Sequence, residues 1–262
     1  MTLDIDRALS EARTAYSERH PESRRLHFEA SKVLPGGNTR SVLDFEPFPF
    51  RVVDTDGPYL VDVEGHRYLD LLGNYSAGLL GHRPEAVEKA VVSALQHGWS
   101  AGAIRPPETE FARLLCERFP SLEQVRFTNS GTEANLMAIA TAQQHTDRSK
   151  IVAFHGGYHG GVLYFGETGR GLLAPHDWVM AKYNDPASIE EAFTRHGSEI
   201  AAVLVEPMVA ASGCIPAENV FLERLRELTT LDASLLIFDE VMTSRLSTGG
   251  AQLLYGINPD LT

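Results

Sequence analysis

The chain has 262 residues, enough for one large domain or two smaller ones, and its 43% hydrophobic and 22% charged residues are ordinary globular values. This composition argues against a disordered, collagen-like or coiled-coil chain, and no apolar run is long enough for a transmembrane helix. The formal net charge of -12 argues against nucleic-acid binding as the main task, because an acidic surface repels phosphate backbones.

Two features of the sequence bear on location. Residues 1–6 lack the basic and apolar regions of a secretory signal. Cys116 and Cys214 form neither a CxxC pair nor a disulfide framework. We therefore expect a cytoplasmic protein that is not attached to a membrane.

Residues 1–80 are predicted to form an N-terminal segment. Apolar residues at helical spacing indicate a first helix from about Ile5 to Tyr16 and a second over 22–33, which ends at a Pro-Gly-Gly turn. Between residues 50 and 72, short β-like runs are separated by Asp-Gly and Glu-Gly turn signals, which predicts a small antiparallel meander.

Residues 81–262 show a different pattern, in which short apolar runs alternate with helical ones. Continuous apolar strands are buried on both faces, so we predict a three-layer α/β domain with a central, mostly parallel sheet. Ligands bind such sheets at the carboxyl ends of the strands. The predicted strands are 125–128, 150–154, 201–205 and 234–238, and the predicted helices are 84–96, 108–119, 132–144, 186–196 and a helix containing 220–228.

The first predicted strand is followed by a candidate anion site. Ser130 and Glu133 have the spacing of a capping box that opens a helix, and Gly131 allows a ligand to approach the backbone closely. Hydroxyl groups such as that of Thr132, together with free N–H groups at a helix N-terminus, favour a phosphate. A plain helix cap is the alternative.

The second strand is followed by a glycine-rich turn that carries Tyr158 and His159. An aromatic ring on such a turn suits stacking on a planar ligand. His155 and His159 are four residues apart, as in zinc proteases, but the Glu of H-E-x-x-H is missing, so we expect no metal. A hydrogen-bonded loop histidine is an equal alternative for His159.

The last two strands end in carboxylates. Glu206 follows one of them, and a helix-terminal charge or a salt-bridge partner is its alternative role. Asp239 follows four apolar residues, as in a Walker B strand, but the chain has no Gly-Lys pair for a P-loop and no G-x-G-x-x-G fingerprint. A buried carboxylate stays ionised beside a cation, and a protonated ring nitrogen of a ligand is such a cation.

A phosphate cradle, an aromatic face and a carboxylate together fit pyridoxal 5'-phosphate. The motifs Asn129–Ala134, Gly157–Gly160, Val205–Pro207 and Phe238–Val241 occur in an order that resembles the class III, fold type I, pyridoxal-phosphate aminotransferases, in the branch of glutamate-1-semialdehyde aminomutase and the β-amino acid transaminases. The resemblance implies that Ser130, Gly131 and Thr132 hold the phosphate, that Tyr158 and Val241 flank the ring, that Asp239 pairs with its nitrogen, and that His159 and Glu206 lie near the cofactor.

The same resemblance places the Schiff-base lysine a few residues beyond Thr262. The four lysines of the chain, at positions 32, 89, 150 and 182, do not lie at the expected strand end. We therefore expect an incomplete large domain without the family's C-terminal small domain, inactive as 262 residues and active as a full-length homodimer.

Arg40 and Tyr75 are the candidate substrate residues. A guanidinium binds a carboxylate through two hydrogen bonds, and by the resemblance Arg40 indicates a β-amino acid such as β-phenylalanine, with a 2-oxo acid as acceptor. A salt bridge for Arg40 and core packing for Tyr75 are the alternatives. The alternative reaction is the intramolecular amino transfer of an aminomutase, and racemases, decarboxylases and lyases share the same scaffold. An alternative from another functional class is a non-catalytic module that only binds the cofactor.

Overall fold

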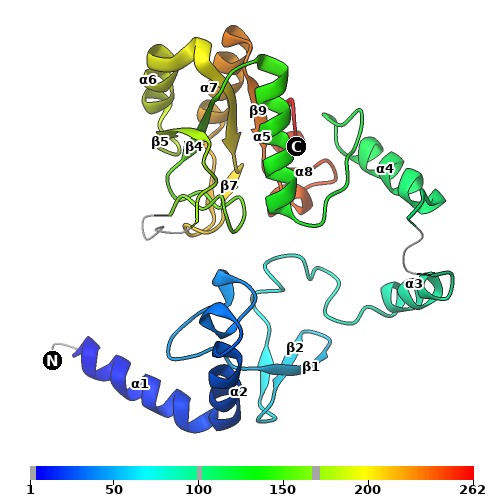
Figure 1. Cartoon of the computed structure of the whole chain (residues 1–262), viewed down its shortest axis with the longest axis vertical. Helices are drawn as coiled ribbons and strands as arrows, with labels where there is room; N and C mark the ends of the chain where they lie inside the picture. Colours follow the sequence, from blue (N-terminus) through cyan, green and yellow to red (C-terminus); the bar gives the residue numbers. More distant parts are fainter. Residues whose placement is uncertain (1–3, 99–101, 167–171) are drawn as a thin grey trace. The chain divides into compact units, whose positions relative to one another are not determined.

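The computed structural model describes residues 4–98, 102–166 and 172–262. It forms two compact units, Met1–Gly102 and Ala103–Thr262, which are described separately (Figure 1). The boundary expected near residue 80 stays a prediction.

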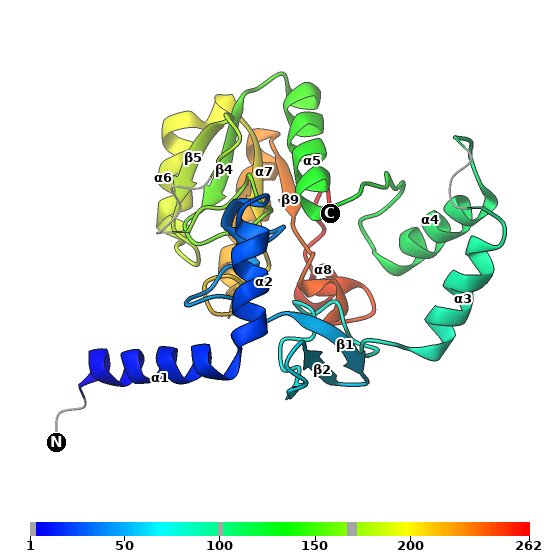
Figure 2. The same ribbon diagram turned by 60° about the horizontal axis from the view of Figure 1, so that its bottom comes forward.

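The first unit joins helices to a small sheet. Its helices are α1 (Ile5–Arg19), α2 (Pro21–Ser31) and α3 (Glu85–Leu95), with short 3-10 turns η1 (Pro35–Gly37) and η2 (Ser41–Leu43). The strands β1 (Val52–Asp56), β2 (Tyr59–Asp62) and β3 (Arg67–Leu69) pair antiparallel in chain order, which confirms the predicted meander. Figure 2 shows the sharp turn between α1 and α2, where His20 lies.

The second unit is built on a parallel sheet with the strand order β5-β4-β6-β9. The elements are α4 (Pro106–Arg118), α5 (Gly131–Thr146), β4 (Lys150–Phe154), β5 (Asp177–Ala181), α6 (Pro186–His196), η3 (Gly197–Glu199), β6 (Ile200–Val205), β7 (Met208–Val209), β8 (Ile215–Pro216), α7 (Asn219–Asp232), β9 (Leu235–Phe238), η4 (Thr243–Arg245) and α8 (Gly250–Tyr255). Strands β7 and β8 form a separate antiparallel pair.

One predicted strand was wrong, and the parallel-sheet strand β5 and the short strands β7 and β8 were not predicted. Residues 125–128 have no regular secondary structure, and no strand in the described part of the chain pairs with them. Phe127 instead stacks on Phe111 of α4, with ring centroids 5.2 Å apart. Strand β5, of sequence DWVMA, carries four consecutive apolar residues like the predicted strands, and its pairing with β4 identifies it as a strand of the sheet.

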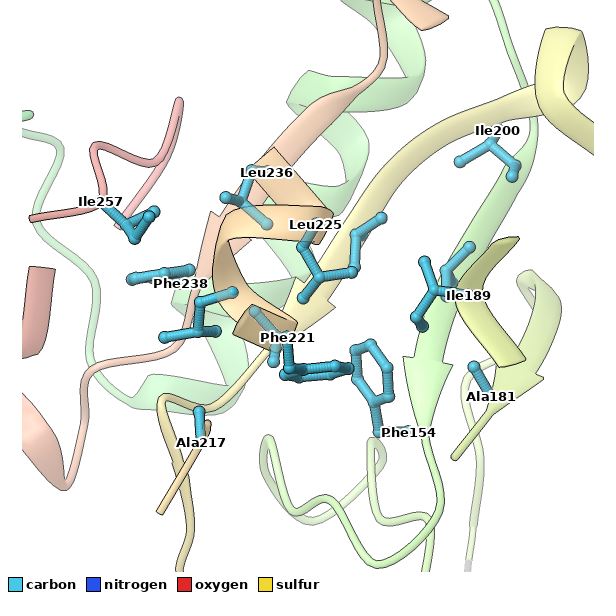
Figure 3. Close-up of a cluster of buried hydrophobic side chains, with 14 residues drawn as sticks. Phe154, Ala181, Ile189, Ile200, Ala217, Phe221, Leu225, Leu236, Phe238 and Ile257 are labelled. Carbon is cyan, nitrogen blue, oxygen red and sulfur yellow. The ribbon is translucent and has the colours of Figure 1, made fainter. Parts of the chain in front are cut away.

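The sheet is covered on both faces, which confirms the three-layer α/β prediction. Successive residues of a strand point to opposite faces, so Val152 and Phe154 enter one core while Ile151 and Ala153 enter the other. Helices α6 and α7 complete the first core (Figure 3), and α5 with the loop after β4 completes the second.

Replacing Leu225 of α7 by alanine is expected to lower the free energy of unfolding by about 2–5 kcal/mol, because the side chain is fully buried and its removal leaves a cavity. Leu231→Ala in the same helix is the control, since that side chain is 82% exposed. Urea unfolding of both variants measures the difference. Equal losses would contradict the placement of the core.

Candidate functional site

A hairpin follows β4 and presents Tyr158 and His159. The Phe165 N–H donates to the Gly157 carbonyl (2.8 Å), and the His159 N–H donates to the Leu163 carbonyl (2.9 Å). Tyr158 is therefore bridged to Tyr164 across the hairpin, and their rings meet edge-on at 5.5 Å. His159 is buried, whereas Tyr158 is half-buried.

Gly160 brings this hairpin against the first turn of α5. Its φ is +125°, a conformation that glycine tolerates, and a Cβ there would overlap Thr132 Oγ1 and lie 2.8 Å from Thr132 Cα. The Gly161 N–H also donates to Thr132 Oγ1, at 3.3 Å. No larger residue fits at position 160 in this arrangement.

The N-terminus of α5 has the features of an anion site. Ser130 caps the helix, because its Oγ accepts the Glu133 N–H at 3.1 Å. The Glu133 carboxylate reaches back to the Asn129 N–H (2.8 Å), one residue earlier than in a standard capping box. Within the described ranges the N–H groups of Gly131 and Thr132 meet no acceptor, so they and the helix dipole are available to an anion.

Asp239 lies directly after β9 and is 7% exposed. Its Oδ2 accepts hydrogen bonds from His159 Nδ1 and Asn135 Nδ2, both at 2.8 Å, and its Oδ1 accepts the Val241 N–H at 3.0 Å. Burial opposes ionisation, but the hydrogen bonds and charge of His159, together with the other donors, hold the pKa of Asp239 below its ordinary value. The carboxylate is therefore ionised at neutral pH.

Asn135 joins the three parts of the site. Its Nδ2 donates to Asp239 and also to the His159 carbonyl, at 3.1 Å. Its role was not predicted, although a polar residue one turn after a capping box, in a helix that packs on a sheet, was a usable signal. The amide thus links α5, the hairpin after β4 and the segment after β9.

Replacing Asn135 by alanine is expected to lower the free energy of unfolding by about 1–3 kcal/mol, because Asp239 and the His159 carbonyl each lose a buried donor. Gln144→Ala, at an exposed position of the same helix, is the control. Thermal melting of the two variants side by side tests this, and a loss no larger than that of the control would count against the network.

Glu206 and Val241 are the remaining predicted residues of the candidate cofactor site. Glu206 is buried after β6, and its carboxylate accepts the N–H groups of Tyr158 (2.8 Å) and Ala210 (3.3 Å). Burial raises the pKa of Glu206. Val241 is 56% exposed, and its Cγ2 would lie 3.0 Å from a Cβ at Gly131, so it borders the start of α5.

Arg40 and Tyr75 belong to the first unit, and their roles stay predictions. The Arg40 N–H donates to Asn38 Oδ1 (3.1 Å), and the Tyr75 hydroxyl donates to the Val42 carbonyl (3.0 Å). Tyr75 is 39% exposed, so it is not a core residue of that unit.

One group in the described chain has the composition of a metal site. Ligand atoms of His20, Asp62 and His66 in the first unit lie within 4.8 Å of one another. His66 Nδ1 is 2.9 Å from Asp62 Oδ2, and Tyr68 OH lies 2.7 Å from His20 Nε2 and 2.8 Å from the same Asp62 oxygen. These are hydrogen-bond distances, and they tie the α1–α2 turn to the meander.

The family follows from comparison with known proteins. The family model "Aminotransferase class-III" matches residues 43–262. The chain belongs to the class III aminotransferases. No helix in the described part of the chain is long and apolar enough to cross a membrane.

Relatives of this member of the class III family include two enzymes with different reactions. It is 48% identical over 258 residues to the β-phenylalanine transaminase of Variovorax paradoxus, covering 98% of this chain and 59% of the relative. It is 43% identical over 260 residues to the glutamate-1-semialdehyde 2,1-aminomutase of Aquifex aeolicus, covering 92% of this chain and 61% of the relative. The chain thus spans about 60% of the length of these relatives.

Solved structures show the same fold. The β-phenylalanine aminotransferase from Variovorax paradoxus superposes with a TM-score of 0.94 at 47% identity, over 98% of this chain and 60% of that one. A transaminase with PLP bound superposes with a TM-score of 0.83 at 34% identity, over 92% of this chain and 60% of that one. The predicted family and fold are confirmed.

Proposed function

We propose that the full-length protein is a pyridoxal-phosphate-dependent transaminase that moves an amino group between a β-amino acid and a 2-oxo acid. The observation that carries this proposal is the ionised Asp239, held by His159 and Asn135 beside the open N-terminus of α5. Similarity to the β-phenylalanine transaminase at 48% identity supports the substrate class.

The residues present fit the cofactor. A carboxylate offers about four acceptor positions, and the described donors to Asp239 use three, so one remains for a protonated ring nitrogen. The unpaired N–H groups of Gly131 and Thr132, with the Ser130 hydroxyl, would hold the phosphate. In this proposal Tyr158 and Val241 flank the ring.

The chain's own residues would prepare the site electrostatically. When bound, pyridoxal phosphate supplies an electron sink that stabilises negative charge at the substrate carbon. Asp239 would keep the ring nitrogen protonated, and His159 and Asn135 keep Asp239 ionised and oriented. We further propose that the Schiff-base lysine lies beyond Thr262, that Arg40 binds the substrate carboxylate, and that Tyr75 lines the substrate entrance.

The second candidate reaction is intramolecular amino transfer, favoured by the 43% identity to a glutamate-1-semialdehyde aminomutase. The homodimer and the cytoplasmic location stay predictions from the resemblance and from the cysteine pattern.

The test is an assay of the full-length protein with pyridoxal phosphate and 2-oxoglutarate against β-phenylalanine, other β-amino acids and glutamate-1-semialdehyde. We expect the 2-oxo acid to be converted to its amino acid only with the β-amino acids. Conversion of the semialdehyde alone would establish the aminomutase instead, and the absence of any turnover would refute both.

A further inference from the structure

We propose that Glu206 is a positioning residue. Its carboxylate accepts the backbone N–H of Tyr158 and so fixes the hairpin that carries Tyr158, without itself touching the cofactor. This inference rests on the proposed function, because it assigns the hairpin the task of holding Tyr158 against the cofactor ring.

The pairing pattern of the hairpin explains why an acceptor is needed. Gly157 and His159 use their backbone groups to bond across the hairpin, so the intervening Tyr158 is a non-hydrogen-bonded position. Its N–H group points away from the partner strand. Flanked by buried Gly157 and His159, this N–H would be costly to leave unpaired, and Glu206 Oε1 accepts it at 2.8 Å.

Glu206 is itself held at both ends. Its Oε2 accepts the Ala210 N–H just after β7, and its backbone carbonyl accepts the Tyr183 hydroxyl at 2.9 Å. Glu206 therefore connects the loop after β6 to the hairpin after β4, which are neighbouring strands of the sheet. Its backbone is anchored, so the length of its side chain determines where the Tyr158 backbone lies.

The Glu206 carboxylate lies next to the Gly157 backbone. A Cβ at Gly157 would lie 3.8 Å from Glu206 Oε1 and 3.3 Å from His159 Nε2. The contact thus depends on the reach of the side chain as well as on its acceptor atom, and these two properties can be separated by substitution.

Two variants of the full-length protein separate reach from charge. Glu206→Gln keeps the length and one oxygen acceptor but loses the charge and the second acceptor. Glu206→Asp keeps the charge but is one methylene shorter. We expect the glutamine variant to bind pyridoxal 5'-phosphate within about threefold of the wild type, and the aspartate variant to bind it roughly tenfold or more weakly, because a hydrogen bond to a charged acceptor is lost. The control pair is Glu223→Gln and Glu223→Asp, at an exposed position of α7.

The cofactor affinity is measured by absorbance titration, and the hydrogen bond itself by amide hydrogen exchange at Tyr158. We expect exchange at Tyr158 to accelerate in Glu206→Asp while the His159 and Phe165 amides, which bond within the hairpin, stay protected. General destabilisation would accelerate all three together and would overturn the proposal.

The reverse order of affinities, with aspartate better than glutamine, would also overturn it, since charge and not position would then matter. Turnover by the wild type is assayed separately. If the proposed function is wrong, the wild type will show no transamination, but the cofactor affinities and amide exchange rates of the two variants can still be compared.

Discussion

Replacing Asp239 by asparagine is expected to slow transamination by the full-length protein by about 10²–10³-fold, the effect of removing one preorganised electrostatic group from an active site. The amide carries no charge to hold a proton on a ring nitrogen. Its NH₂ group would also face a donor in either orientation, because His159 Nδ1 and Asn135 Nδ2 point at Oδ2 and the Val241 N–H points at Oδ1. Single-turnover rates at saturating cofactor measure the loss.

The control for this substitution is Asp177→Asn, at the opposite, N-terminal end of β5, where the exposed carboxylate pairs with Lys150. A surface ion pair of this kind contributes little, so its rate should stay close to wild type. Similar rates for both variants would remove Asp239 from the proposed chemistry.

Asp239 also makes stability depend on pH in a defined direction. Its pKa in the folded protein is lower than in the unfolded chain, because the donors from His159, Val241 and Asn135 outweigh burial. The stabilisation is therefore complete above the unfolded value of about 3.9 and is lost as the pH falls from there through the folded pKa. Urea midpoints across this range should fall less steeply in Asp239→Asn than in the wild type, and parallel curves would contradict the assignment.

Replacing Gly160 by alanine is expected to lower the free energy of unfolding by about 2–6 kcal/mol and to weaken binding of pyridoxal phosphate. Strain at a positive φ costs about 1–3 kcal/mol, and overpacking against Thr132 adds about 1–3 kcal/mol. Because the new methyl group meets the Thr132 backbone as well as its side chain, the hairpin must move away from α5.

Gly161→Ala is a closely matched control, since a Cβ at that position meets nothing within 4 Å. Urea unfolding and cofactor titration of the two neighbours give the comparison. If alanine is tolerated equally at both positions, the close approach of the hairpin to α5 is not a requirement of the fold.

The parallel sheet was predictable because three of its strands are continuous apolar runs. Strands β4, β6 and β9 carry almost only apolar side chains, and a sheet buried on both faces requires this pattern. The rule that ligands gather at the carboxyl ends of strands predicts that His159, Glu206 and Asp239 lie close together. In the structure His159 is hydrogen-bonded to Asp239, and Glu206 accepts the backbone N–H of Tyr158, the residue next to His159.

The sequence did not reveal which segments and side chains contact one another. Residues 125–128 have a strand-like composition but pair with no strand in the described chain, whereas β5, in which residues 178–181 are all apolar, pairs with β4. The bond from Asn135 to Asp239 likewise depends on which residues the fold brings into contact. Periodicity describes one segment at a time and cannot specify a partner elsewhere in the chain.

The hydrogen bond between Asn135 and Asp239 joins residues 104 positions apart, and this separation has a consequence for biosynthesis. A ribosome that has released α5 must add most of the second unit before the partner of that amide exists. The nascent chain can form early helices while the Asn135 side chain is still hydrated. The buried hydrogen bond from Asn135 to Asp239 can form only after β9 has been translated.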